Sequence, residues 1–441
     1  MELKYSDKTL ADLVQALVYL YILTIPFHTL GLRFIGLHIG LPEIVFIILV
    51  PLAIIHIIRS GKKLWIDKLD FFVFGWLIAT IIVGWHTGFY SIVVNEIIKT
   101  AYLVVLYIIL KWIISSNIIT QIVEVILLSS LIAALTGIIG FGFGYIGIDT
   151  FLIIKRPFPY GIENVLQAKG FTPSPHMLAS IIMIGVFIQL QKFTKNKASL
   201  NRKDYLIVPI LLIGFLLTFS KIIVCLLIGI ILILYFNYKS ILSNSLRFIA
   251  ITSVGILFIV YIFGTHFIIV EKNQDYELLK GDYIAGPALT ETAYYSIYPS
   301  QYWSLKEISI KAIGQSFPWG LGSGKFNEYA HELKNNDLYP THVPYPDPHS
   351  TYFGILAENG LLGLIALGGI IFFVTIMSRN ILKENSHDSH FITCLPPIFI
   401  TIAIEAVCTD VMNFRHYWIL LILLASSFES IKLFSWKRQN L

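Results

Sequence analysis

Charged side chains are scarce in this chain. Asp, Glu, Lys and Arg make up 13% of its 441 residues, whereas soluble domains carry roughly 25%. Hydrophobic residues make up 56% of the chain, and the mean hydropathy is +0.75. This composition excludes an ordinary soluble globular protein. The formal net charge of +5 is too small to indicate nucleic acid as a partner.

Cysteine and nucleotide-binding motifs are scarce as well. The three cysteines (Cys225, Cys394 and Cys408) lie in apolar runs without a metal-binding spacing, which is typical of small buried hydrophobes. A Walker motif, a glycine-rich nucleotide fingerprint, an HExxH pair and a DxD-type acidic motif are all absent from the sequence. The sequence therefore predicts a function that uses neither a cofactor nor a metal ion.

Long apolar runs are abundant, and they recur from end to end. Runs of about 20 residues are typical of membrane-spanning helices, whereas β-barrels show weaker alternating segments. The sequence therefore predicts an all-α polytopic membrane protein with about twelve spans. They are expected near residues 10–27, 41–58, 71–86, 93–113, 118–145, 175–191, 206–220, 222–237, 248–270, 352–377, 391–411 and 416–432.

The distribution of basic residues predicts the orientation of these spans. With a cytoplasmic N-terminus, the cytoplasmic segments hold the majority of the 32 lysine and arginine residues, including the basic loops 59–68 and 192–203. Both termini are therefore expected in the cytoplasm. No small-residue cleavage site follows the first apolar run, so this run is interpreted as a retained span rather than a signal peptide.

Two long segments are expected on the outer face, at 146–174 and 271–351. The second lies between spans nine and ten and is rich in proline and tyrosine. A structureless loop of that length is improbable, so we expect a folded cap with short helices, one of them over Tyr302–Gln315. Its aromatic residues favour either a platform for sugars or anchoring at the lipid headgroups. The chain thus divides into 1–270 with nine spans, the loop 271–351, and 352–441 with three spans.

His349 is the first candidate catalytic residue, because it closes this loop at the head of the tenth span. Histidine titrates near neutral pH and is the usual general base for activating a hydroxyl nucleophile. Pro346 and Pro348 stiffen the approach, and Ser350 or Thr351 is placed to cap the helix that follows. The alternative is a structural histidine that forms a hydrogen bond at the membrane interface.

Three cations on the same face are candidates for binding an anionic group. Lys221 lies between spans seven and eight, where the alternatives are anion binding and snorkelling to the interface. Arg156 lies in the first outer segment and suits either a pyrophosphate or lipid headgroups. Arg415 lies in the turn between the last two spans, where pairing with Asp410 is the alternative.

Ionisable residues inside the apolar runs are functional candidates by default, since lipid burial is costly. They are Glu96, Glu124, Glu358 and Glu405. A transporter or flippase of lipid-linked oligosaccharide is the alternative function, but it predicts repeated halves and several acids at midplane. The halves of this chain are not alike, and most polar chemistry is expected at one face. An enzyme is therefore favoured over a transporter. Because ATP and nucleotide sugars are not normally available outside the cytoplasm, its donor is expected to be already activated and carried by lipid.

The residues around His349 resemble the O-antigen ligase and polymerase superfamily. There, a histidine opens a helix that carries an E-x-G-L-x-G-like stretch, as in Pro348-His349-Ser350 followed by Glu358-Asn359-Gly360-Leu361-Leu362-Gly363. Three other segments are similar to family motifs: the glycine-rich Phe317–Phe326, Gly170–Ala179 with His176 in place of an asparagine, and Thr218-Phe219-Ser220-Lys221 in place of T-x-S-R.

The resemblance implies a GT-C-like, metal-independent, inverting glycosyltransferase of the bacterial inner membrane, with its active site facing the periplasm. Its donor would be an undecaprenyl-pyrophosphate-linked glycan in membrane lipid. Its acceptor would be a sugar hydroxyl of another glycan or of lipid A-core, in O-antigen, capsule or exopolysaccharide assembly, with a chain-length regulator as a further partner. By position, His349 would be the base and Lys221 would replace the arginine that stabilises the leaving pyrophosphate.

A second family arginine is expected near Trp303, where this chain has none. Lys306, Lys311 and Arg156 are the candidate replacements. Because the arginine pair is not preserved, a polymerase is favoured over a ligase.

Overall fold

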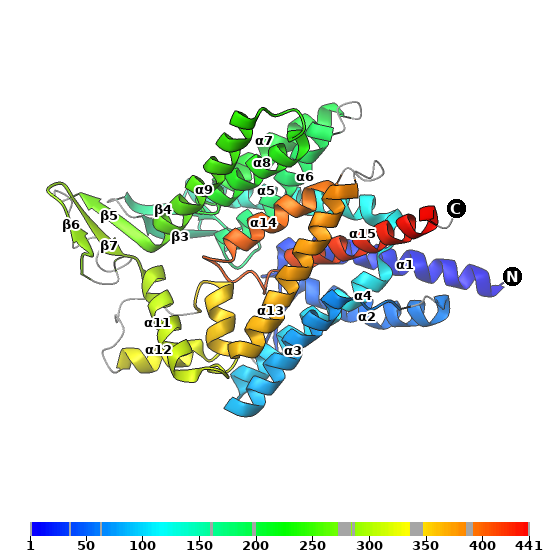
Figure 1. The fold of residues 1–441 in the computed structure, drawn as a ribbon, viewed down its shortest axis with the longest axis horizontal. Coiled ribbons are helices and arrows are strands. Elements are labelled where there is room, and N and C mark those ends of the chain that lie inside the picture. The colour runs from blue at the N-terminus through cyan, green and yellow to red at the C-terminus, as the bar shows by residue number, and fades with distance from the viewer. Residues whose placement is uncertain are drawn as a thin grey trace.

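The computed structural model describes residues 2–34, 37–61, 64–158, 162–195, 200–271, 284, 287–335, 347–384 and 391–439. Figure 1 shows a bundle of long helices with both termini at one end. The sheet strands labelled β3 to β7 lie at the opposite end, together with the helices α11 (Gln301–Ser316) and α12 (Phe326–Asn335). Parts of the predicted cap, 272–283, 285–286 and 336–346, lie outside the described residues.

Each of the predicted spans overlaps a helix of the bundle. These helices are α1 (Glu2–Thr24), α2 (Leu41–Ser60), α3 (Lys68–Thr87), α4 (Ser91–Ile113), α5 (Ile119–Tyr145), α6 (Pro175–Lys195), α7 (Arg202–Leu216), α8 (Ile223–Tyr238), α9 (Asn244–His266), α13 (Thr351–Glu384), α14 (Leu395–Glu405) and α15 (Arg415–Gln439). Within the described ranges, eight helices are long and apolar enough to cross a membrane. The all-α polytopic fold is therefore confirmed, and the number twelve stays a prediction.

Burial separates the centre of the bundle from its rim. In the apolar membrane-spanning stretch of α6, 78% of the residues are buried, whereas only 6% are buried in the corresponding stretch of α9. Leu178, Ile182 and Phe187 of α6 are completely or almost completely buried in the main hydrophobic cluster. α6 is thus a central helix and α9 a peripheral one. The first residues of α6 lie deep at the end of the bundle opposite the termini, which is called the outer end below.

Short antiparallel strands and two helices form the outer end. The hairpins are β1 (Gly31–Phe34) with β2 (Leu37–Gly40) and β3 (Ile153–Phe158) with β4 (Ile162–Ala168). A third sheet has the order β5-β7-β6, from Phe267–Glu271, Tyr295–Pro299 and Thr290–Glu291. α11 (Gln301–Ser316) confirms the helix expected over 302–315, and α12 (Phe326–Asn335) follows it.

The glycine-rich segment after α11 docks on a kink in α13. The kink is at Gly360, whose φ is +59°, a backbone conformation that favours glycine. The Leu361 N–H donates to Pro318 O at 2.8 Å, and the Gly322 N–H donates to Glu358 O at 2.9 Å. A Cβ atom on Gly360 would lie 2.1 Å from Pro318 O, so the close approach itself requires glycine. The two glycine motifs therefore form one joint that holds α11 beside the head of α13.

Candidate functional site

The turn that carries His349 is held from two sides. The His349 N–H donates to Asp347 Oδ1 at 2.6 Å. From α11, Lys306 Nζ donates to the carbonyl oxygens of Pro348 at 2.7 Å and His349 at 2.5 Å. His349 has a φ of +45°, which costs a non-glycine residue about 1–3 kcal/mol and persists only where the surroundings impose it. The contacts of Lys306 and Asp347 supply that restraint.

The surroundings of His349 favour its neutral form. Burial lowers the pKa of the imidazole, and the positive charges of Lys306, His176 and Arg156 lower it further, while Asp347 acts in the opposite direction. A general base must be unprotonated to accept a proton. His349 therefore meets this requirement at neutral pH.

Lys221 and His349 both contact the ring of Tyr302. Lys221 Nζ is 5.1 Å from the centre of the Tyr302 ring and donates to Gly264 O at 3.1 Å. The Tyr302 ring meets the His349 ring edge to face, with 5.1 Å between their centres. The Lys221 side chain keeps accessible surface, but it lies deep enough among protein atoms for desolvation to lower its pKa to about 8. One α11 side chain thus brings a cation and a base together.

Backbone strain marks both of these turns. Across the described ranges, the non-glycine residues with positive φ are Phe219, at +46°, and His349, at +45°. Phe219 lies two residues before Lys221, in the turn between α7 and α8. Such strain is typical of functional sites, where the surrounding structure over-determines the backbone.

The other predicted cations differ in their placement. Arg156, on β3, is exposed, and its charge acts on both Tyr302 and His349. Lys306 is only 6% exposed and is engaged by backbone carbonyls, so it positions the His349 turn rather than facing open space. Lys311 is exposed, five residues further along α11. With about 3.6 residues per turn it lies on another side of that helix.

Arg415 belongs to a separate cluster. Its guanidinium forms an ion pair with Glu43 of α2 and lies over the Tyr102 ring, 5.5 Å from its centre. The predicted alternative of pairing with Asp410 is wrong: Asp410 instead accepts hydrogen bonds from Thr351 and Asn413. Proximity in the turn suggested that pairing, but Glu43, in the first turn of α2, provides a nearer carboxylate.

Residues 206–368 match the family model described as O-antigen ligase. This segment holds the Lys221 turn, α11, the glycine-rich joint and His349. Residues 206–368 are called the O-antigen ligase domain below, after the family model that they match. The predicted resemblance to the O-antigen ligase and polymerase superfamily is thereby confirmed over these residues, and it supports a membrane enzyme of glycan assembly. A search of curated proteins finds no match to the chain.

Three polar residues from outside the O-antigen ligase domain, His176, Glu405 and Thr409, come together in the structure, and the sequence did not indicate this contact. His176, at the start of α6, lies with Nε2 2.9 Å from Glu405 Oε1 and 3.1 Å from Thr409 Oγ1. Its Nδ1 is 3.3 Å from Ser220 Oγ, inside the O-antigen ligase domain. The proline-histidine entry to α6 was a visible signal, but the partners of His176 are too far away in sequence to be inferred.

The head of α13 is bonded to the loop between α14 and α15. The Thr351 N–H donates to Ala406 O at 3.0 Å and to Thr409 O at 3.2 Å. The Ser350 hydroxyl donates to Ala406 O at 3.3 Å. The base turn of the O-antigen ligase domain is therefore fixed to a C-terminal loop outside that domain.

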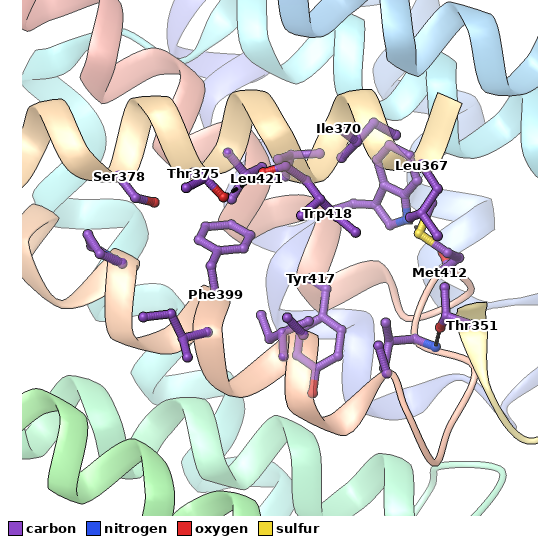
Figure 2. Close-up of a pocket in the computed structure, with 18 of the residues that line it drawn as sticks. Thr351, Leu367, Ile370, Thr375, Ser378, Phe399, Met412, Tyr417, Trp418 and Leu421 are labelled. Carbon is purple, nitrogen blue, oxygen red and sulfur yellow. Dashed lines mark hydrogen bonds between the residues drawn. The ribbon is translucent and has the colours of Figure 1, made fainter. Parts of the chain in front are cut away.

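An apolar cavity of about 350 Å³ lies between α13, α14 and α15. Figure 2 shows Trp418 and Tyr417 of α15 and Phe399 of α14 along it, with Thr351 near one end and Ser378 at the other. Two lining residues, Ile371 and Ile400, are 38% and 41% exposed, so the cavity opens on the outer surface of the bundle. The cavity thus begins beside the base turn and extends into the apolar depth of the membrane region.

No group of three or more His, Cys, Asp or Glu residues in the described part of the chain is placed to hold a metal ion. The absence of a metal or cofactor from the reaction stays a prediction.

Proposed function

We propose that the protein is a bacterial inner-membrane glycosyltransferase that transfers a glycan from an undecaprenyl-pyrophosphate-linked donor to a sugar hydroxyl. The observation that supports it is that Lys221 and His349 both contact the ring of Tyr302. Attack by a hydroxyl needs a base, and departure of a pyrophosphate needs a cation. His349 and Lys221 would meet these two requirements around one side chain, that of Tyr302.

In the proposed reaction, the acceptor oxygen attacks the anomeric carbon of the donor. The bond between that carbon and the phosphate oxygen breaks, with inversion, and pyrophosphate leaves on its lipid. His349 takes the hydroxyl proton. Its Nδ1 lies 3.5 Å from Asp347 Oδ1, which favours the tautomer with a proton on Nδ1 and leaves Nε2 to act as the base. Lys221 neutralises charge on the pyrophosphate, and Arg156 adds positive potential nearby.

The apolar cavity supports a donor carried by lipid. Beyond Thr351 and Tyr352 at the head of α13, its lining residues on this helix extend from Leu367 to Leu382, about 22 Å along the axis at about 1.5 Å per residue. This is a large part of a hydrocarbon core of about 30 Å. A polyprenyl chain in this cavity would place its pyrophosphate near Thr351 and the His349 turn.

The test is glycan analysis in a strain that lacks the gene and is complemented with variants. His349→Ala is expected to be inserted normally but to abolish the product, with a loss of roughly 10²-fold or more from the missing base. His38→Ala, which alters an exposed histidine on β2, is the matched control. Normal glycan from His349→Ala would show that His349 is not the base.

The same strain separates the two enzyme classes. A single repeat unit on the core indicates loss of a polymerase, and we favour this outcome because the arginine pair of the family is not preserved. Lipid-linked polymer that remains unattached indicates loss of a ligase. A transporter or flippase predicts a third outcome: purified wild-type protein in detergent leaves a lipid-linked donor chemically unchanged.

A further inference from the structure

His176 lies between a buried carboxylate and the turn that carries Lys221. Glu405 of α14 is completely buried, and its two oxygens contact His176 Nε2 and the Tyr417 hydroxyl. On the other side of the imidazole, Ser220 Oγ is 3.3 Å from Nδ1. The chain Glu405–His176–Ser220 therefore runs from the interior of the bundle to the residue directly before Lys221.

We propose that Ser220 is a further substrate-binding residue, whose hydroxyl donates a hydrogen bond to a phosphate oxygen of the donor. His176, held by Glu405, is the positioning residue that orients this hydroxyl. The inference rests on the proposed function, since it assigns a second contact to the pyrophosphate that Lys221 neutralises.

The proton positions give the physical basis of this role. Glu405 accepts from the Nε2–H of His176. When Nδ1 also carries a proton, it donates to Ser220 Oγ, and the serine hydroxyl hydrogen is then free to point into the site. The positive charge on the ring also lies next to the arriving anion. When Nδ1 carries no proton, it retains the Ser220 hydroxyl as its own donor, so phosphate binding selects the first arrangement.

Ser220 and Lys221 are consecutive residues of one strained turn. Phe219, with its positive φ, precedes both residues. The Ser220 N–H donates to Thr218 Oγ1 at 3.3 Å. A lysine provides a point charge without the planar fork of an arginine, so a second donor next to it restores part of the lost phosphate contact. Ser220, directly before Lys221 in the same turn, carries a hydroxyl that can supply it.

His176 also links this turn to the base. The Thr409 hydroxyl that lies 3.1 Å from Nε2 belongs to the loop whose carbonyl oxygens receive the Thr351 N–H. His349 lies two residues before Thr351. The His176 imidazole thus contacts both the turn that carries Lys221 and the loop that holds the His349 turn. Its position therefore affects the distance between Lys221 and His349.

The test uses the full-length protein in detergent, with inorganic pyrophosphate as the probe in titration calorimetry and thermal melting as the check of folding. Ser220→Ala is expected to weaken pyrophosphate binding roughly 10-fold or more, the scale of a hydrogen bond to a charged group. Ser220→Thr keeps the hydroxyl and should bind within about threefold of wild type. His176→Gln should weaken binding like Ser220→Ala, and the double variant should be no weaker than either single one.

The matched control is Ser180, which lies one turn after His176 on α6. Ser180 Oγ of α6 pairs with His416 Nε2 at 2.9 Å, a buried serine–histidine contact that faces α15. Ser180→Ala should leave pyrophosphate binding unchanged.

Three outcomes are informative. Wild-type binding in Ser220→Ala, or additive losses in the double variant, would overturn the role of Ser220 while leaving the proposed function intact. If the wild-type protein itself binds no pyrophosphate, the proposed function and this inference fail together. Loss in Ser220→Ala, rescue in Ser220→Thr and no further loss in the double variant support the inference.

Discussion

Two lysines at opposite ends of the helix bundle differ in what surrounds them. Lys111, near the end of α4, is completely buried, with Nζ 2.5 Å from Asp70 and 3.1 Å from Asp67. Its ammonium also lies 3.6 Å from the centre of the Trp65 ring. Lys221, at the outer end, contacts a carbonyl oxygen and the Tyr302 ring, and no carboxylate of the described residues pairs with it.

The difference separates a structural cation from one that keeps its charge available. A buried ion must be paired, and once paired with two carboxylates it has no remaining attraction for a ligand. Neutral dipoles such as a carbonyl and an aromatic face hold an ammonium without cancelling its charge. The Asp67 side chain also caps α3, so the Lys111 cluster fastens α3 to α4 at the start of a span. Lys221 has no comparable structural partner.

The largest effect should come from breaking the paired lysine. Lys111→Met leaves Asp67 and Asp70 close together and unpaired in a buried place, which costs about 3–5 kcal/mol. We expect a marked fall in yield and melting temperature in detergent, whereas Lys221→Met should melt like the wild type. Equal melting of all three proteins would show that pairing with carboxylates does not distinguish the two lysines.

A second effect should concern activity rather than folding. Lys221→Ala is expected to reduce transfer roughly 10²-fold, the scale of losing a preorganised charge contact, while Lys221→Arg retains activity. Lys311→Ala, on another side of α11, should be unaffected and serves as the matched control. Wild-type rates in Lys221→Ala would refute the assignment of this cation to the pyrophosphate.

The wild type and Lys221→Arg should differ in how their donor affinity depends on pH. The pKa of Lys221 is lowered to about 8 by desolvation, so its positive charge is complete well below pH 8 and is lost as the pH rises through that value. Donor affinity in the wild type should therefore fall above pH 8. Arginine stays protonated throughout this range, so KM measured from pH 7 to 9 should rise less in Lys221→Arg.

The smallest effect is expected in the apolar cavity, where no charge is involved. Ile371→Trp places a larger side chain in the lining and should raise the KM for a long-chain lipid donor several-fold, with little change for a short-chain analogue. Ile365→Trp is the control, since this residue is on the same helix and exposed but does not line the cavity. Equal KM values for both variants would argue against lipid binding there.

The sequence predicted the parts of this structure that depend on local composition. Apolar runs located the bundle helices because a span must present apolar side chains over a continuous length. The helical spacing in the cap located α11, and the polar-to-apolar boundary placed His349 at the head of α13. The histidine and glycine motifs also indicated the family, which the match over residues 206–368 confirms.

Only the tertiary structure decided the partners of the charged residues. In sequence, Arg415 was suited to a phosphate or to Asp410, and the fold instead brings it to Glu43 at the start of α2. Lys306 was a candidate for binding the pyrophosphate. The joint at Gly360 places α11 so that this lysine donates to the carbonyl oxygen of His349 and holds its turn. His176 and Glu405 are 229 residues apart and meet because α6 and α14 share the outer end of the bundle. Hydropathy records which segments enter the membrane, but the pairing of charges depends on which segments become neighbours there.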